Sequence, residues 1–163
     1  MSPELRWPPA ADEPALVRIE TGTLIKRPPE KAFAFATNAA LWGKWHPATA
    51  GVSNVANRPL VTGETVTESI RAGPRSFSAT WKVLACEAPA LWVIATRTDE
   101  GDSRIVYEVA PEGDFCRFQR TLEYRSRRWP WTMLDTNLTR WTLERQSQRA
   151  IENLKRVLEG GFV

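Results

Sequence analysis

Two charged residues stand in segments whose other inward-facing positions are apolar. Glu68 alternates with Val66 and Ile70, and Arg120 occupies the same kind of position within residues 116–124. A buried charge lowers stability by roughly several kcal/mol unless it is paired. We therefore expect the two side chains either to pair with each other or to lie in a wet cavity and contact a ligand. An exposed position at the rim of the sheet is the remaining interpretation.

Three further side chains could orient or protonate a bound molecule. Tyr107 and Tyr124 fall on inward faces by the same alternation, so their hydroxyls could orient a ligand. His46 is the single histidine of the chain and precedes Pro47. Its simplest interpretation is a turn residue. Because imidazole titrates near neutral pH, the sharper hypothesis is a proton carrier at the mouth of a cavity.

Tryptophan is unusually frequent, with eight residues in 163. Large aromatic rings fill cores, but aromatic walls with a few polar groups also form small-molecule cavities. We expect at least two of the tryptophans to line a cavity. The catalytic residues, if any, stay unknown, and the candidate cavity-lining residues are Trp42, Trp45, His46, Glu68, Trp81, Tyr107, Arg120, Tyr124 and Trp141.

The usual signatures of metal and cofactor chemistry are missing from the sequence. A zinc site needs closely spaced ligands, whereas Cys86 and Cys116 are isolated and His46 has no partner histidine. No glycine-rich phosphate loop, dinucleotide fingerprint or Gly-x-Ser-x-Gly elbow occurs. We expect no metal and no cofactor.

The formal net charge of +3 is modest. Nucleic-acid binders usually cluster basic residues on one face, and the densest cluster here is Arg125, Arg127 and Arg128. We interpret it as a solvated strand end and turn, with contact to a phosphate or an acidic ligand as the alternative. A nucleic-acid partner is not expected.

Hydropathy and cysteine usage indicate a cytoplasmic location. There is no run of about 18 apolar residues to span a membrane, and no basic stretch followed by an apolar block marks a secretory signal. Cys86 and Cys116 each lie in a strand-like segment. That position favours buried thiols in a reducing compartment over a disulfide.

Alternating hydrophobicity predicts a mainly antiparallel sheet of about six to seven strands with one covered face. Two short helices follow the first strand, one beginning at Pro29 and one at residues 39–45, where Asn38 is a suitable cap. The strand-like segments are residues 16–26, 63–71, 75–86, 91–97, 105–109 and 116–124. Residues 91–97 are apolar on both faces, so the alternation does not assign their inward side.

A long C-terminal helix is predicted over residues 131–159, and Gly160 and Gly161 end it. One apolar stripe contains Leu143, Ala150, Ile151, Leu154, Val157 and Leu158. Leu134, Leu138 and Trp141 lie roughly opposite that stripe. Three explanations stay open: a kink near Trp141, a separate first segment, or burial of this half on both sides. Only this helix is long enough to cover the open face of the sheet. All three explanations therefore leave the predicted fold class as α+β, with a helix on one face of an antiparallel sheet.

The chain divides into a loose arm and one domain. Residues 1–14 contain four prolines and no periodic pattern, so they are expected to be a flexible arm that can be removed with little loss of stability. Residues 15–163 form the predicted domain, with no internal repeat and no second domain.

Three stretches, together with this order of elements, resemble the START-like (SRPBCC) superfamily and, within it, the polyketide cyclase/dehydrase branch. They are Ile25 to Phe35, which resembles the entry from strand to helix; Asn38 to Pro47, with its tryptophans; and Ala150 to Glu159, which resembles the end of the C-terminal helix. The resemblance covers roughly residues 17–159. It implies a helix-grip fold with a cavity between the sheet and the long helix. Members bind lipids, polyketides, quinones or hormones, so the fold alone does not fix the function.

Three functions remain open from the sequence. The first is binding of a small apolar or aromatic molecule without a cofactor. The second is a cofactor-free cyclase, aromatase or dehydratase working by acid–base catalysis, for which Arg120, Glu68, Tyr107, Tyr124 and His46 are the candidates. The third is a protein-interaction module that uses the segment from Trp129 to Trp141 as an exposed apolar patch. The oligomeric state is undecided, and a homodimer is compatible with the sequence.

Overall fold

The computed structural model describes residues 17–72, 74–99, 101–126 and 136–160, without the side chains of residues 72, 126 and 136–139. Seven strands form one antiparallel sheet in the order β1-β7-β6-β5-β4-β3-β2. In chain order the elements are β1 (Val17–Ile25), α1 (Pro29–Ala36), the 3₁₀ helix η1 (Ala39–Lys44), β2 (Thr49–Ser53), β3 (Thr65–Ala72), β4 (Arg75–Glu87), β5 (Leu91–Arg97), β6 (Gly101–Glu112), β7 (Phe115–Ser126) and α2 (Thr136–Glu159).

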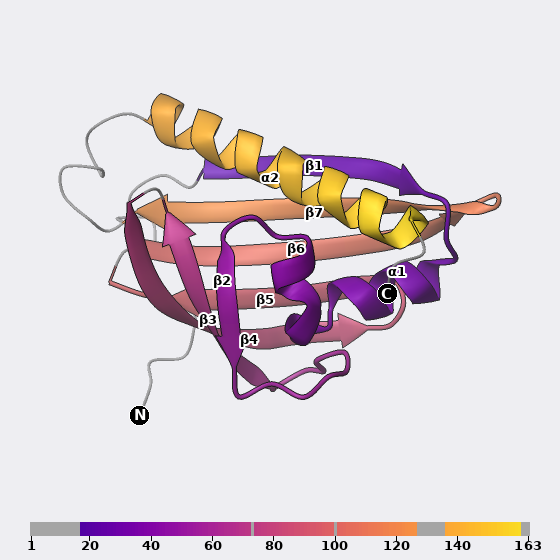
Figure 1. The fold of residues 1–163 in the computed structure, drawn as a ribbon, viewed down its shortest axis with the longest axis horizontal. Coiled ribbons are helices and arrows are strands. Elements are labelled where there is room, and N and C mark those ends of the chain that lie inside the picture. Colours follow the sequence, from indigo (N-terminus) through magenta and orange to yellow (C-terminus); the bar gives the residue numbers. More distant parts are fainter. Residues whose placement is uncertain (1–16, 73, 100, 127–135, 161–163) are drawn as a thin grey trace.

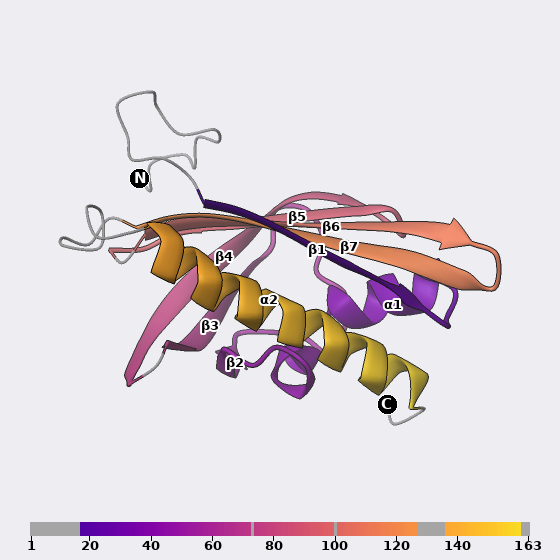
Figure 2. The same cartoon turned by 90° about the horizontal axis from the view of Figure 1, so that it is seen from above.

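The sheet is curled, and the helices occupy its concave side. In Figure 1, α2 lies across β1 and β7. In Figure 2, α1 and α2 lie on the same side of the sheet, and β3 and β4 bend toward that side. This is the helix-grip arrangement, which confirms the predicted α+β class. None of the described helices is long and apolar enough to cross a membrane.

The segment between β1 and β2 forms two short helices for local reasons. Pro29 stands in the first turn of α1 with Glu30 beside it, where a fixed φ and a negative charge are both favourable. Asn38 accepts a hydrogen bond from the Ala40 backbone N–H and caps η1, as expected. Trp42 then turns into the core and donates its indole N–H to the Ala36 carbonyl oxygen, 3.0 Å away.

The predicted strand parities hold across the sheet. Val66, Ala79, Val109 and Phe118 are buried on the concave face. For β5, whose inward side the alternation did not assign, Trp92 joins the core cluster together with Ile94. The edge strand β2 was not predicted, because Thr-Ala-Gly-Val-Ser lacks clean alternation.

The sequence interpretation of Arg125 as a solvated residue is wrong. Its side chain is 2% exposed and forms a buried ion pair with Asp102 of β6, and Arg97 adds a second ion pair to the same carboxylate at 3.4 Å. Gly101 permits this approach of β6 and β7, because a Cβ there would collide with the Arg125 carbonyl oxygen. Arg127 and Arg128, the rest of the basic cluster, lie outside the described residues.

Helix α2 packs on the sheet through the predicted stripe. Ala150, Ile151 and Leu154 are fully buried, and Leu158 is nearly so. The helix continues unbroken from Thr136 to Glu159, so a kink or a separate segment at Trp141 is not needed. Trp141 is 53% exposed, which also excludes burial of both sides at that residue. Leu134 and the side chain of Leu138 lie outside what the structure describes.

We expect Leu154→Ala and Ile151→Ala each to lower the free energy of unfolding by about 2–5 kcal/mol, since each removes a large side chain from a close-packed site. Urea denaturation measures the change. Arg149→Ala, at an exposed position of the same helix, is the matched control and should change stability by less than about 0.5 kcal/mol. Equal effects at residues 149 and 154 would contradict the described packing.

Candidate functional site

A pocket of about 810 Å³ lies between the concave face of the sheet and the N-terminal half of α2. Its apolar walls are Trp42, Ala48, Ile70, Phe77, Trp81, Ile94, Ile105, Leu122 and Leu143. Exposed Arg71, Pro74 and Arg75 also line it, at the β3–β4 hairpin, and we take them as the mouth. The other polar residues of its lining are His46, Thr49, Glu68, Ser76, Ser103, Tyr107, Arg120, Tyr124 and Gln146.

Glu68 is 5% exposed and has donors for both carboxylate oxygens. Thr49 donates its hydroxyl to Oε1 at 2.5 Å, and the Trp81 indole N–H donates to Oε2 at 2.7 Å. Burial raises the pKa of Glu68, while these two hydrogen bonds and the charge of Arg120 oppose the rise. Thr49 is on β2 and Trp81 on β4, so Glu68 on β3 joins three strands at one side of the pocket.

Arg120 is 2% exposed on β7 and is held mainly by neutral groups. One guanidinium nitrogen donates to the Ser147 hydroxyl on α2 at 2.9 Å, and the other lies 3.3 Å from Nε2 of His46. The guanidinium Nε is buried and has no hydrogen-bond partner among the described residues. Of the three arrangements considered for Glu68 and Arg120, the ion pair does not form in the described part of the chain, and neither side chain lies at an exposed rim.

His46 is a half-buried residue whose ring faces Arg120. Burial and the neighbouring guanidinium lower its pKa from 6.5 to about 3, so the ring is neutral at physiological pH. Since a guanidinium has only donors, Nε2 accepts from Arg120 and the ring proton is on Nδ1. That atom is buried and, within the described residues, has no hydrogen-bond partner.

Tyr107 lies opposite Arg120 on the neighbouring strand β6. Its ring stacks on Trp92 with centroids 5.3 Å apart. Burial raises the pKa of its hydroxyl to about 12, although the charge of Arg120 and a hydrogen bond with that residue oppose the rise. Tyr107 therefore keeps its proton at physiological pH.

Seven of the nine candidate residues line this one pocket: Trp42, His46, Glu68, Trp81, Tyr107, Arg120 and Tyr124. Trp45 does not line it. Instead it is 1% exposed in the core behind the pocket, 5.6 Å from the ring of His46 and 6.2 Å from the ring of Tyr107. Trp141 does not line it either, because it stands on the opposite side of α2.

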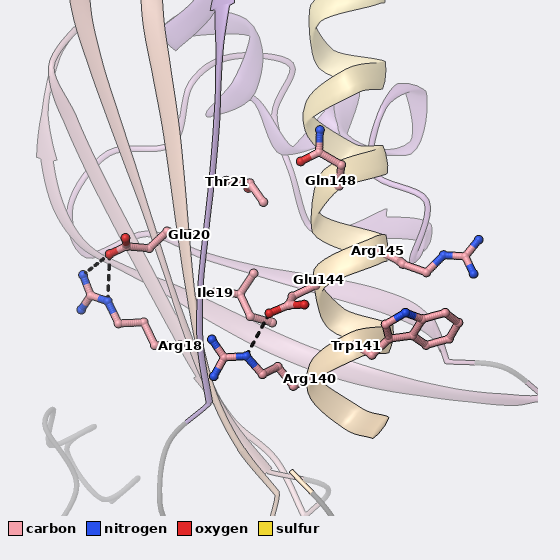
Figure 3. Close-up of a pocket in the computed structure, with 9 residues that line it drawn as sticks. All are labelled: Arg18, Ile19, Glu20, Thr21, Arg140, Trp141, Glu144, Arg145 and Gln148. Carbon is pink, nitrogen blue, oxygen red and sulfur yellow. Dashed lines mark hydrogen bonds and ion pairs between the residues drawn. The ribbon is translucent and has the colours of Figure 1, made fainter. Parts of the chain in front are cut away.

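Trp141 belongs to an open groove of about 840 Å³ between β1 and α2. Figure 3 shows Ile19 and Thr21 turned toward the helix, and Trp141 and Arg145 extending from α2 away from β1. The guanidinium carbon of Arg145 is 4.8 Å from the centre of the Trp141 ring, a cation–π distance. Trp129 and Trp131, the rest of the suggested interaction patch, lie outside the described residues.

Ser147 and Thr49, which hold Arg120 and Glu68, were not singled out from the sequence, and neither were the lining residues Arg71, Arg75, Ser76, Ser103 and Gln146. Ser147 interrupts the apolar stripe of α2 between Leu143 and Ala150, and a small polar residue at a buried helical position is a signal that could have found it. Thr49 offers no such signal, because it lies on the unpredicted edge strand. The described residues contain no cluster of His, Cys, Asp or Glu side chains that could hold a metal ion.

Comparison with known proteins gives a family match over nearly the whole described chain. Residues 17–159 match the family described as polyketide cyclase/dehydrase and lipid transport. A comparison with curated proteins finds no match.

Solved structures match at low identity, so they show the fold alone. TTHA0849 from Thermus thermophilus is 12% identical, with a TM-score of 0.75 over 90% of this chain and 100% of that one. Ara h 8.0201 is 9% identical, with a TM-score of 0.66 over 90% of this chain and all of the other. The di-domain ARO/CYC protein BexL from the BE-7585A biosynthetic pathway is 15% identical, with a TM-score of 0.63 over 86% of this chain and 45% of that protein.

We expect His46 to make stability depend on pH. The unfolded ring binds a proton below pH 6.5 and the folded ring only near pH 3, so the unfolded state binds more protons in this window. Stability is therefore lost as the pH falls through it, by roughly 2 kcal/mol between pH 7 and pH 5. His46→Gln should remove this part of the slope in urea denaturation. Lys44→Gln, an exposed neighbour, is the control, and an unchanged slope in His46→Gln would exclude the buried neutral imidazole.

Proposed function

Because the chain belongs to the polyketide cyclase/dehydrase and lipid transport family, we propose that it binds a small, largely apolar or aromatic molecule between the sheet and α2. A lipid-, polyketide- or quinone-like compound fits this description. The observation that carries the proposal is the pocket of about 810 Å³, which combines aromatic and aliphatic walls with the buried polar residues Glu68, Tyr107 and Arg120 from β3, β6 and β7. Small-molecule sites typically have volumes of roughly 300–1,000 Å³ and this composition.

The pocket supports binding better than acid–base catalysis. A general acid or base works best with a pKa near the operating pH. The pKa of His46 is about 3 and that of Tyr107 about 12, so neither changes its protonation near neutral pH. Glu68, whose pKa is raised by burial, is the group that best supports the alternative of a cofactor-free cyclase or dehydratase.

A cytoplasmic location is part of the same proposal. Cys86 is half-buried, Cys116 is buried, and both are free thiols. Unpaired cysteines fit a reducing compartment.

We expect the ligand to be lost when the pocket is filled. Leu122→Trp places a large ring at a pocket-lining position, so protein purified from its own host should lose the non-covalently bound mass that native mass spectrometry detects for the unmodified chain. Ser78→Trp adds the same bulk at an exposed position of β4 and should keep the bound mass.

Two results would contradict the proposed binding. Equal bound mass on the Leu122→Trp protein, checked to be folded by thermal melting, would place the ligand elsewhere. An unmodified protein that takes up no molecule even after incubation with a lipid extract of its host would not be a binder of this class.

A further inference from the structure

Among the described residues that line the pocket, positively charged residues outnumber negatively charged ones. Among the described residues, Arg71, Arg75 and Arg120 contribute three guanidinium groups to the lining, whereas Glu68 contributes the single carboxyl group. His46 adds no charge, because it is neutral. Whether Glu68 is ionised or protonated, the lining is net positive, and a ligand that enters it meets a field that favours anions.

Arg120 is the most buried of these cations and forms no ion pair with a carboxylate of the described residues. A buried charge is normally paired, because desolvating an isolated ion is costly. Among the described residues its hydrogen-bond partners are the Ser147 hydroxyl, the neutral ring of His46 and the hydroxyl of Tyr107, which are all uncharged. Its Nε–H is buried and has no acceptor in the part of the chain that the structure describes.

Glu68 does not act as the carboxylate partner of Arg120 in the described structure. Both of its oxygens already accept hydrogen bonds, from Thr49 and Trp81, and it forms no ion pair with Arg120 within the described residues. These donors hold the Glu68 carboxyl on the β2–β4 side of the pocket, while Arg120 is held by Ser147 and His46 on the other side.

One polar group beside Arg120 also lacks an acceptor among the described residues. The Nε–H of Arg120 and the Nδ1–H of His46 are both buried donors without partners in the described chain. Tyr107 retains its phenolic proton and lies on the adjacent strand. Unsatisfied buried donors are rare in native proteins and each needs an explanation. A hydrogen-bond acceptor on the bound ligand would explain why these donors have no partner in the protein.

From this geometry we infer that the ligand is an amphiphile with a carboxylate group, which binds to the Arg120 guanidinium while its apolar body occupies the Trp42–Trp81–Ile105 wall. The inference rests on the proposed function and names the chemistry of its ligand. A planar carboxylate matches the fork of an arginine, since it can accept two parallel hydrogen bonds.

The test compares ligands that differ only in charge. Calorimetric titrations with 2-naphthoate and 2-naphthamide, and with decanoate and decanamide, are run at about 0.15 M salt, where charges at the exposed mouth are screened. The unmodified protein should bind each carboxylate at least about tenfold more tightly than its amide, as a hydrogen-bonded charge pair implies. Shifts of the tryptophan indole N–H signals in NMR spectra locate the bound probe.

Two variants separate the inner arginine from the general field. Arg120→Gln should bring the carboxylate-to-amide ratio close to one and leave amide binding within about threefold. Arg149→Gln, which removes an exposed arginine of α2 that does not line the pocket, is the matched control and should change the ratio by less than about threefold. Thermal melting checks that each variant is folded. If Arg120→Gln does not fold, Ser147→Ala, which removes one guanidinium hydrogen bond, should lower the ratio instead.

The possible failures are distinct. Amides that bind as tightly as carboxylates to the unmodified protein would overturn the inference and leave the proposed binding function in place. A preference that survives Arg120→Gln, or that disappears with Arg149→Gln, would also overturn it. If no probe of either pair binds, the proposed function and the inference fail together.

Discussion

The structure depends on one constraint: a single long helix must cover a sheet of seven strands. Helix α2 satisfies this constraint in its C-terminal half, where Ile151, Leu154 and Leu158 fill the space against the sheet. Toward its N-terminus the inward positions become Ser147, Gln146 and Leu143, which are polar or only half-buried. The close apolar packing between α2 and the sheet therefore ends partway along the helix, and β3 and β4 curl around the space that remains. The pocket is the part of the concave face that α2 approaches but does not fill.

Polar residues in that space are held by neutral partners rather than by each other. Glu68 and Arg120 are both buried, yet the hydroxyls of Thr49 and Ser147, an indole and an imidazole satisfy most of their hydrogen bonds. The pair of Asp102 and Arg125 shows the contrasting solution, in which opposite charges on adjacent strands meet directly. Charges that do not neutralise each other cost stability. Their retention at buried positions beside the aromatic and aliphatic walls of the pocket is the pattern expected where function conflicts with stability.

The sequence predicts well which face of the sheet or helix a residue occupies, but it predicts poorly which residues it contacts. Period-two alternation placed Glu68 and Arg120 correctly on the concave face, and the helical projection correctly separated Trp141 from the apolar stripe. Alternation does not show which residues meet across the sheet. Glu68 is on β3 and Arg120 on β7, with three strands between them, so they share a pocket only because the sheet curls. The hydrogen bonds that Glu68 and Arg120 form with Thr49, Ser147 and His46 depend on that curvature and on the docking of α2. Local sequence patterns do not encode either of these features.

Ser147 connects the site to the stability of the fold. Its hydroxyl joins α2 to Arg120 on β7, one helical turn before Ile151, the residue that packs in the centre of the core. A ligand that lies on Arg120 and against Leu143 thus contacts both layers that the helix and sheet bring together. Because such a ligand binds the docked arrangement and not the unfolded chain, occupancy and stability are linked through mass action. Because the pocket is a gap in the packing between α2 and the sheet, a ligand that fills it would stabilise the docking of α2 on the sheet.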